Sequence, residues 1–214
     1  TTWIAMIGII ADWSLADLEE FSKQYPDLIL DEKTTEKIIY STPLGKLIRI
    51  FAFILKGKIS EVIKLVSILS KIDSPYELLN KETPRAKYIL KHIEKIEKKY
   101  NILLEKALSS KQRGKLFIFT YPSKEFSFTS ELSNEVISKI QKDIIIIGRK
   151  KEKEVILSIR SKDKSKYILP KIIEKSIVGI QGYGGGHPHA CGAHIDLEDY
   201  GRFIENFKKN LTKL

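Results

Sequence analysis

The spacing of apolar residues changes once along the chain, and this change limits the folds open to it. Between Leu44 and Leu69 apolar residues recur at intervals of three and four across a break at Gly57, which predicts two amphipathic helices. After Gly114, short apolar runs alternate with helical patterns. The expected strands and helices are strands at 116–121, 144–147 and 155–160 and helices at 132–140, 167–175 and 197–211. Strands interleaved with helices predict the α/β class, with one sheet covered by helices.

The first half of the chain is predicted to be helical, and a long charged helix follows it. Ser14 to Asp17 is typical of a helix start, and a short helix to about Tyr25 is expected. From Pro84 an apolar stripe continues to Ala107. It fits either a coiled-coil seam or a single helix that bridges two lobes, and the small number of heptads favours the single helix. The predicted domains are residues 1–83, a connecting helix over 84–113, and an α/β domain over 114–214.

Composition indicates the general class of protein and its cellular location, but not its function. Apolar residues make up 43% of the 214 residues, enough for a buried core, and one cysteine cannot form an internal disulfide. With no apolar run of membrane length and no visible signal peptide, a cytoplasmic protein is expected, with no membrane partner. The chain begins at Thr1 without methionine and enters an apolar stretch at once, so a fragment of a longer protein is also expected.

Positive charge is concentrated in one segment. The formal net charge is +10, and residues 142–175 hold eleven Lys and Arg against five Asp and Glu. Such a surplus suits a polyanion such as nucleic acid, because neutralising phosphates releases counterions. A Lys- and Glu-rich solvated surface, of the kind that heat-adapted proteins favour, fits the charge equally well.

A glycine- and histidine-rich stretch, GYGGGHPHACGAHI, holds three of the four histidines and the only cysteine. Gly184, Gly185 and Gly186 leave backbone that a ligand can approach closely, and successive amides can form an anion-binding nest. His187 follows them and can donate a ring hydrogen bond to the same anion. The pattern therefore predicts a phosphate site.

Two other interpretations of the same stretch stay open. Four possible zinc ligands occur in it, namely His187, His189, Cys191 and His194. If the segment were a strand, the first three would share one face, but His194 would point to the other. The remaining interpretation is a glycine turn whose histidines are buried and hydrogen-bonded.

Three segments together resemble a known family. Gly184 to His187, followed by two residues and then Ala190, Cys191 and Gly192, resembles the GGGHxxAAG motif of the C-terminal domain of DHH-family phosphoesterases, which include RecJ-type nucleases and nanoRNases; Cys191 replaces an alanine. Ser158 to Ser161 is similar to the S-x-R-S segment of that family.

By this resemblance, Arg160, Ser161, the three glycines and His187 bind substrate phosphate, and His187 also serves catalysis. An arginine suits phosphate because its planar fork can bind two oxygens at once, whereas without the resemblance a solvated arginine at a strand end is favoured.

The third similar segment lies near the N-terminus. Gly8 to Asp12 resembles the G-x-x-A-D motif that closes the catalytic domain of archaeal-type RecJ-like proteins, where the aspartate is a metal ligand. An aspartate after an apolar run also fits a cap of the next helix. By the resemblance, the complete enzyme holds two Mn²⁺ or Mg²⁺ ions, of which Asp12 would bind one.

Most of the expected metal ligands are missing from this chain. The aspartate-rich motifs and the DHH triplet do not occur in it, and two-metal hydrolysis needs several such ligands. The chain alone is therefore expected to be inactive, and to act as the C-terminal part of an exonuclease on single-stranded DNA or RNA, completed by further sequence or by a separate chain that carries the missing motifs.

The resemblance also allows two alternative functions. The first is a non-catalytic scaffold of the replicative helicase assembly that binds GINS proteins. The second is a phosphodiesterase for short oligonucleotides or cyclic dinucleotides. The basic segment favours longer strands, because more phosphates then meet more lysines.

Overall fold

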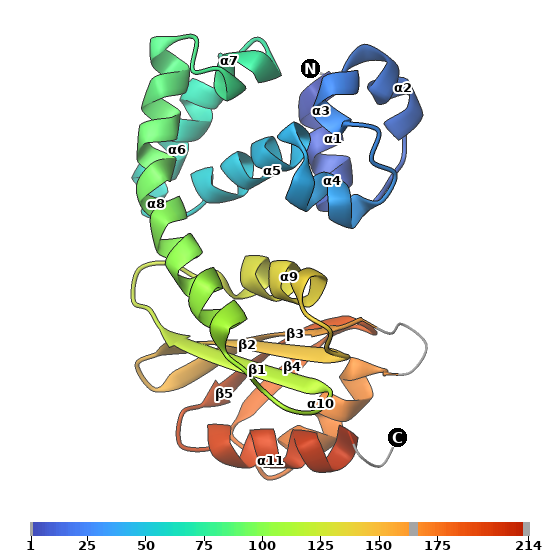
Figure 1. The fold of residues 1–214 in the computed structure, drawn as a ribbon. Coiled ribbons are helices and arrows are strands. Elements are labelled where there is room, and N and C mark those ends of the chain that lie inside the picture. Colours follow the sequence, from blue (N-terminus) through green and yellow to red (C-terminus); the bar gives the residue numbers. More distant parts are fainter. Residues whose placement is uncertain (1, 163–166, 212–214) are drawn as a thin grey trace. The chain divides into compact units, whose positions relative to one another are not determined.

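The computed structural model describes residues 2–162 and 167–211, which divide into two compact units, Thr1–Lys99 and Tyr100–Leu214. Figure 1 shows helices alone in the first unit and a sheet with helices in the second. The boundary between the units falls inside the long helix α8 (Pro84–Ser109). No described helix is both long enough and apolar enough to cross a membrane.

The first unit consists of helices that bury apolar side chains between them. Its elements are α1 (Thr2–Ala11), α2 (Leu18–Gln24), α3 (Pro26–Ile29), α4 (Thr35–Ser41), α5 (Pro43–Ile54), α6 (Ile59–Leu69), α7 (Pro75–Leu79) and the first part of α8. The apolar face of α5 is buried, as its spacing of three and four requires. Thr42 begins this helix because its hydroxyl accepts a hydrogen bond from the Gly45 amide. The two helices predicted on either side of Gly57 are confirmed as α5 and α6.

The helix predicted from Ser14 begins later than expected. The Ser14 hydroxyl accepts a hydrogen bond from the Ala16 amide in a local turn, and α2 starts only at Leu18. Asp17 precedes α2 in a left-handed conformation and makes no side-chain cap bond. The polar side chains that favour a helix start here stabilise a turn before it instead.

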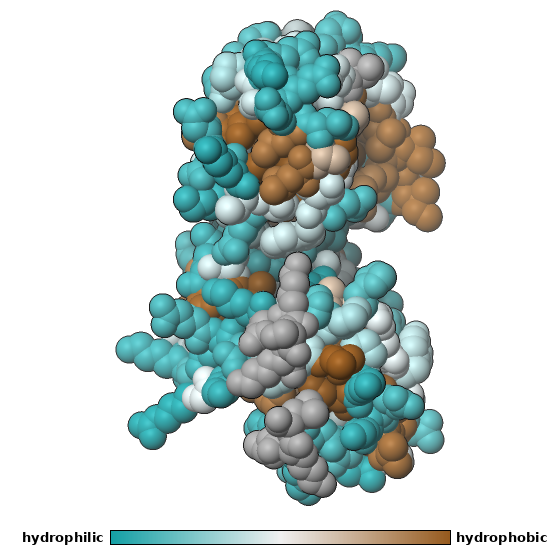
Figure 2. Space-filling view, turned by 90° about the vertical axis from the view of Figure 1, so that its right-hand side faces the viewer, coloured by the Kyte–Doolittle hydropathy of each residue, from teal (hydrophilic) through white to brown (hydrophobic). Residues whose placement is uncertain are grey.

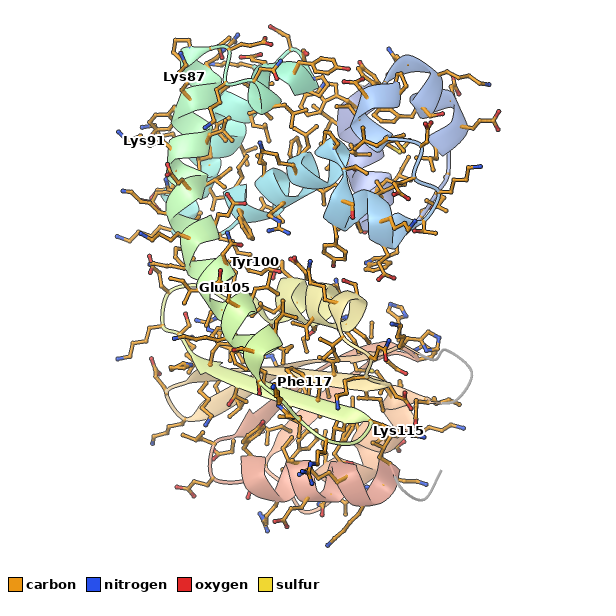
Figure 3. The ribbon with its side chains drawn as sticks, viewed as in Figure 1. Lys87, Lys91, Tyr100, Glu105, Lys115 and Phe117 are labelled. Atoms are coloured by element: carbon orange, nitrogen blue, oxygen red, sulfur yellow. The ribbon has the colours of Figure 1, made fainter. Side chains whose placement is uncertain are left out.

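Helix α8 passes through both units and buries its apolar stripe within the chain. Ile89, Ile93 and Ile96 are buried in the first unit, and Tyr100 is buried in the second. The Tyr100 hydroxyl donates a 2.6 Å hydrogen bond to Glu135 of α9 (Thr129–Lys139), and Figure 3 labels Tyr100 on this part of α8. The stripe is therefore used for packing inside the chain. The exposed side of α8 carries lysines, among them Lys87 and Lys91 (Figure 3).

The second unit is a mixed five-stranded sheet with helices on both faces, so the predicted α/β class is confirmed. Its strands are β1 (Leu116–Pro122), β2 (Ile144–Lys151), β3 (Glu154–Ser161), β4 (Gly182–His187) and β5 (Ala190–Asp196). The spatial order is β1-β2-β3-β5-β4, with β1 and β2 parallel and the other neighbours antiparallel. Helix α9 covers β2 and β3 on one face, while α10 (Leu169–Ile177) and α11 (Tyr200–Leu211) lie on the other (Figure 1).

The main core of this unit lies between the sheet and the pair α10 and α11. Alternate residues of β2, β3 and β5 point into it, together with Phe203 and Phe207 of α11. On the opposite face, the hydroxyls of Ser133 and Ser158 join α9 to β3 at 2.9 Å. The free edge of β1 is partly covered because the Gln112 side chain bonds both backbone groups of Ile118. Figure 2 shows that hydrophobic residues also reach the surface in both units.

Candidate functional site

The glycine- and histidine-rich stretch forms a β-hairpin, and its turn is fixed at two points. His187 pairs with Ala190, so Pro188 and His189 make up a two-residue turn between β4 and β5. The Ser161 amide donates a 3.0 Å hydrogen bond to the His189 carbonyl, and the Leu169 amide donates one of the same length to the Pro188 carbonyl. The end of β3 and the start of α10 therefore hold the turn in place.

The three consecutive glycines do not form the predicted nest, because they lie in strand β4. Successive amides of an extended strand point to opposite sides, whereas a nest needs them to converge. A β-carbon on Gly184 would lie 2.8 Å from the Ala193 methyl, and one on Gly186 would lie 2.6 Å from the Ala190 carbonyl oxygen. Gly186 also has a φ of 142°. These two glycines are thus required by the hairpin itself.

Gly185 differs from its two neighbours because it faces open space. A β-carbon added there would meet no heavy atom within 4 Å. Its partner across the hairpin, Gly192, is also exposed. Together the two glycines leave a patch of bare backbone on the sheet face opposite α10, and a ligand can approach this patch without meeting side chains.

Arg160 lies on the same sheet face and is held by α9. Its Nε donates a 2.7 Å hydrogen bond to Asn134 Oδ1, and its Nη2 donates a 3.1 Å bond to the Ser130 hydroxyl. Ser130 and Asn134 are four residues apart on α9, which places both on one side of that helix. Neither residue stands out in the sequence, because Ser130 precedes the helix predicted over 132–140 and Asn134 belongs to no motif.

The sheet register brings His187 to the face that carries Arg160. Arg160 pairs with Ala190, and Ala190 pairs with His187, so the three residues form one row across β3, β5 and β4. Residues paired directly across antiparallel strands point to the same face, and two strand spacings separate Arg160 from His187 by about 10 Å. His187 is exposed.

Ser161 lies apart from this row, because it follows Arg160 on the strand and points to the opposite face. It is buried.

The zinc interpretation is not supported by the hairpin geometry. Among residues 2–162 and 167–211, no group of three or more His, Cys, Asp and Glu side chains is placed to hold a metal ion. Cys191 is buried in the core on the α10 side, and its thiol donates to the His187 carbonyl. The interpretation with buried, hydrogen-bonded histidines also fails in part, since His187 is exposed.

Burial of Cys191 is expected to lower the reactivity of its thiol. Desolvation raises the pKa of this thiol from 9 to about 11, although the charge of Arg160 opposes the shift. Since the thiolate is the reactive form, we expect alkylation by iodoacetamide at pH 8 to be about a hundredfold slower in the folded chain than in denaturant. Because burial penalises the thiolate, the free energy of unfolding keeps its full value below about pH 9 and decreases as the pH rises from 9 through 11. Equal alkylation rates in the two states would contradict the buried position.

Asp12 lies in the first unit, directly after α1. Its amide donates a hydrogen bond to the Gly8 carbonyl, and its side chain is exposed. It does not cap the next helix, which begins six residues later at Leu18. Since no described group of three ligands surrounds it, Asp12 alone does not make a metal centre, and the described residues do not fit a two-metal site.

The basic segment does not form one patch around the hairpin. Lys150, Lys151 and Lys153 stand at the turn between β2 and β3, while Lys171 and Lys175 lie on α10. The Lys142 ammonium donates to the carbonyls of Gln112 and Gly114. Lys164 and Lys166 fall outside the described residues. The surplus charge is therefore spread over several surfaces of the second unit.

Comparisons with known proteins agree with this fold. Residues 117–213 match the family model described as the DHHA1 domain. The chain resembles the pGpG-specific phosphodiesterase PggH from Vibrio cholerae at 16% identity and a TM-score of 0.57, over 91% of this chain and 68% of that one. It also resembles RecJ from Thermus thermophilus in complex with Mg²⁺, at 13% identity and a TM-score of 0.58, over 97% of this chain and 30% of that one.

A second structure of the Thermus thermophilus RecJ, in complex with Mn²⁺, is similar at 10% identity and a TM-score of 0.57, over 97% of this chain and 28% of that one. No curated protein matches the chain. At these identities the likeness to solved structures shows the fold alone, and the chain spans less than a third of either RecJ structure. Residues 117–213 thus match the DHHA1 domain, and these neighbouring structures share the fold of the chain.

Proposed function

We propose that the second unit is the substrate-binding part of a DHH-type phosphodiesterase and binds the phosphates of a nucleic acid strand. The observation that carries the proposal is the single sheet face on which Arg160, His187 and the bare backbone at Gly185 lie together. The guanidinium and the imidazole are donors, and the open strand lets a phosphate come close to both. The DHHA1 match and the DHH-family neighbours support this class of function.

Each residue then has a separate part in the site. Arg160, oriented by Asn134 and Ser130, binds phosphate oxygens, and His187 donates to the same strand and stabilises charge on the scissile phosphate in the complete enzyme. Ser161 fixes the hairpin turn through its amide, while Gly184 and Gly186 allow the hairpin to form. The divalent ions that hydrolysis needs would be held mostly by residues outside this chain, with Asp12 proposed as one ligand.

Binding of a fluorescent single-stranded oligonucleotide, followed by anisotropy over a salt series, tests the proposal. We expect Arg160→Ala and His187→Ala each to weaken binding about tenfold, because each removes one phosphate contact. Arg160→Ala should also reduce the slope of log K against log salt by about 0.7, the value for one phosphate of a single strand. Arg113→Ala removes an equal charge from an exposed loop and should change affinity less than about twofold.

The same measurement separates the proposed function from its alternatives. Salt-dependent binding that neither Arg160→Ala nor His187→Ala alters would overturn the site, since only the dispersed lysines would then bind. No binding to any strand would favour the scaffold that binds GINS proteins. A series of oligonucleotides of increasing length distinguishes a processive exonuclease from a phosphodiesterase for short substrates. In the second case, the affinity of the chain for the oligonucleotide would stop rising at a length of two or three nucleotides.

A further inference from the structure

A stacked aromatic pair lies on the same sheet face as the candidate phosphate site. Tyr183 of β4 and His194 of β5 pair directly in the ladder, and their rings stack with centroids 4.9 Å apart at an angle of 7°. Tyr183 is 68% exposed although it is large and aromatic. Glu154 Oε2 lies 3.5 Å from His194 Nδ1 and so restrains the second ring. The pair is therefore an ordered aromatic surface that faces solvent.

The pair and the phosphate site are connected by bare backbone. Tyr183, Gly185 and His187 alternate along β4 and so point to one face, with about 13 Å between the first and the last. The only residues that lie between them on this face of the hairpin are Gly185 and Gly192, which have no side chains. A strand bound at Arg160 and His187 can thus lie flat along the hairpin as far as Tyr183.

The charges around the pair favour a neutral group over a phosphate. An open hollow beside Tyr183 and His194 is lined by Lys151 and Lys153, and also by three carboxylates, those of Glu152, Glu154 and Asp196. Carboxylates that outnumber lysines repel an anion, whereas an aromatic ring attracts the face of a nucleobase. The two ends of the hairpin face therefore differ in chemistry, with the hydrogen-bond donors of Arg160 and His187 at one end and an aromatic surface at the other.

We propose that the stacked Tyr183 and His194 rings form a platform for a nucleobase of the strand whose phosphate lies at Arg160 and His187. This inference rests on the proposed function and specifies its substrate as a strand that carries bases, since a bare sugar-phosphate chain cannot stack. Stacking does not depend on which base is present, so the platform adds affinity with little sequence preference.

The test compares two oligonucleotides of equal length and charge, one of thymidines and one in which abasic sites replace all internal bases. Anisotropy gives the affinity of the full chain for each. We expect Tyr183→Ala to weaken binding of the base-carrying strand about tenfold and to leave binding of the abasic strand unchanged. Tyr183→Phe should keep the wild-type affinity, because the ring remains. Tyr88→Ala, which removes another exposed tyrosine, should affect neither strand.

Failure of the platform and failure of the phosphate site give different results. Equal weakening of both strands by Tyr183→Ala, or no weakening of either, overturns the platform, while sensitivity to Arg160→Ala in the same assay still supports the phosphate site. A wild-type chain that binds neither strand overturns both.

Discussion

Replacing Gly185 with valine is expected to abolish most strand binding while the hairpin stays folded. A β-carbon at this position meets no heavy atom within 4 Å, and β-branched residues are favoured in strands, so the free energy of unfolding should change by less than about 1 kcal/mol. The added isopropyl group would stand on the bare backbone between His187 and Tyr183. It should keep a strand away from both ends of the face and weaken binding between about tenfold and a hundredfold.

Anisotropy and chemical denaturation of the same protein sample check this result. Gly185→Ala serves as a graded control, since a single methyl group should weaken binding less than valine does. Wild-type affinity in Gly185→Val would place the bound strand elsewhere on the unit. A loss of stability as large as the affinity loss would mean that Gly185 is structural, like its neighbours.

Gly186→Val, only one residue further along, should mainly destabilise the fold. A φ of 142° is strained for any residue with a β-carbon, and that carbon would lie 2.6 Å from the Ala190 carbonyl oxygen and 3.0 Å from Cys191 Cα. Backbone strain and overpacking each cost about 1–3 kcal/mol, so the free energy of unfolding should fall by about 3 kcal/mol. Urea denaturation followed by circular dichroism measures this difference.

Gly201→Ala is the matched control for this effect. Gly201 lies in α11 of the same unit, with no atom within 4 Å of an added β-carbon, and alanine is the better helix former. We expect the control to raise the free energy of unfolding by about 0.5–1 kcal/mol. If Gly186→Val left stability unchanged, the hairpin turn would have to adopt another conformation to accept the side chain.

Many, but not all, of the helices and strands of this protein follow from local sequence, since β4 and β5 were not predicted. The spacing of apolar residues in α5, α6 and α8 and the runs of isoleucine in β2 predicted helix and strand in the right places, because burial of one helix face or of a whole strand leaves a direct trace in the sequence. The start of α2 was misplaced, since the same hydroxyl can stabilise either a cap or a turn.

Some features of the candidate site could be predicted from the sequence, and others could not. The cluster of glycines and histidines marked Gly184 to His187, and the resemblance to the S-x-R-S segment marked Arg160, although the roles of these residues remain proposals. The strand conformation of the glycines was not predicted, because glycine has weak local preferences and only pairing with β5 fixes its extended form. Ser130 and Asn134 left no trace in the sequence that could link them to Arg160, which is 26 residues beyond Asn134.

The sequence by itself thus predicted the α/β class, the strands β1 to β3 and most of the longer helices, and it singled out residues suited to phosphate, but it did not predict β4 and β5. Only the tertiary structure decided which of these residues act together, because the register of β3, β5 and β4 aligns Arg160 with His187 and Tyr183 with His194. The register also decides that Gly185 faces open space while Gly184 and Gly186 face packed atoms. Side chains alternate between the two faces of a sheet, so a shift of one residue would reverse every one of these assignments.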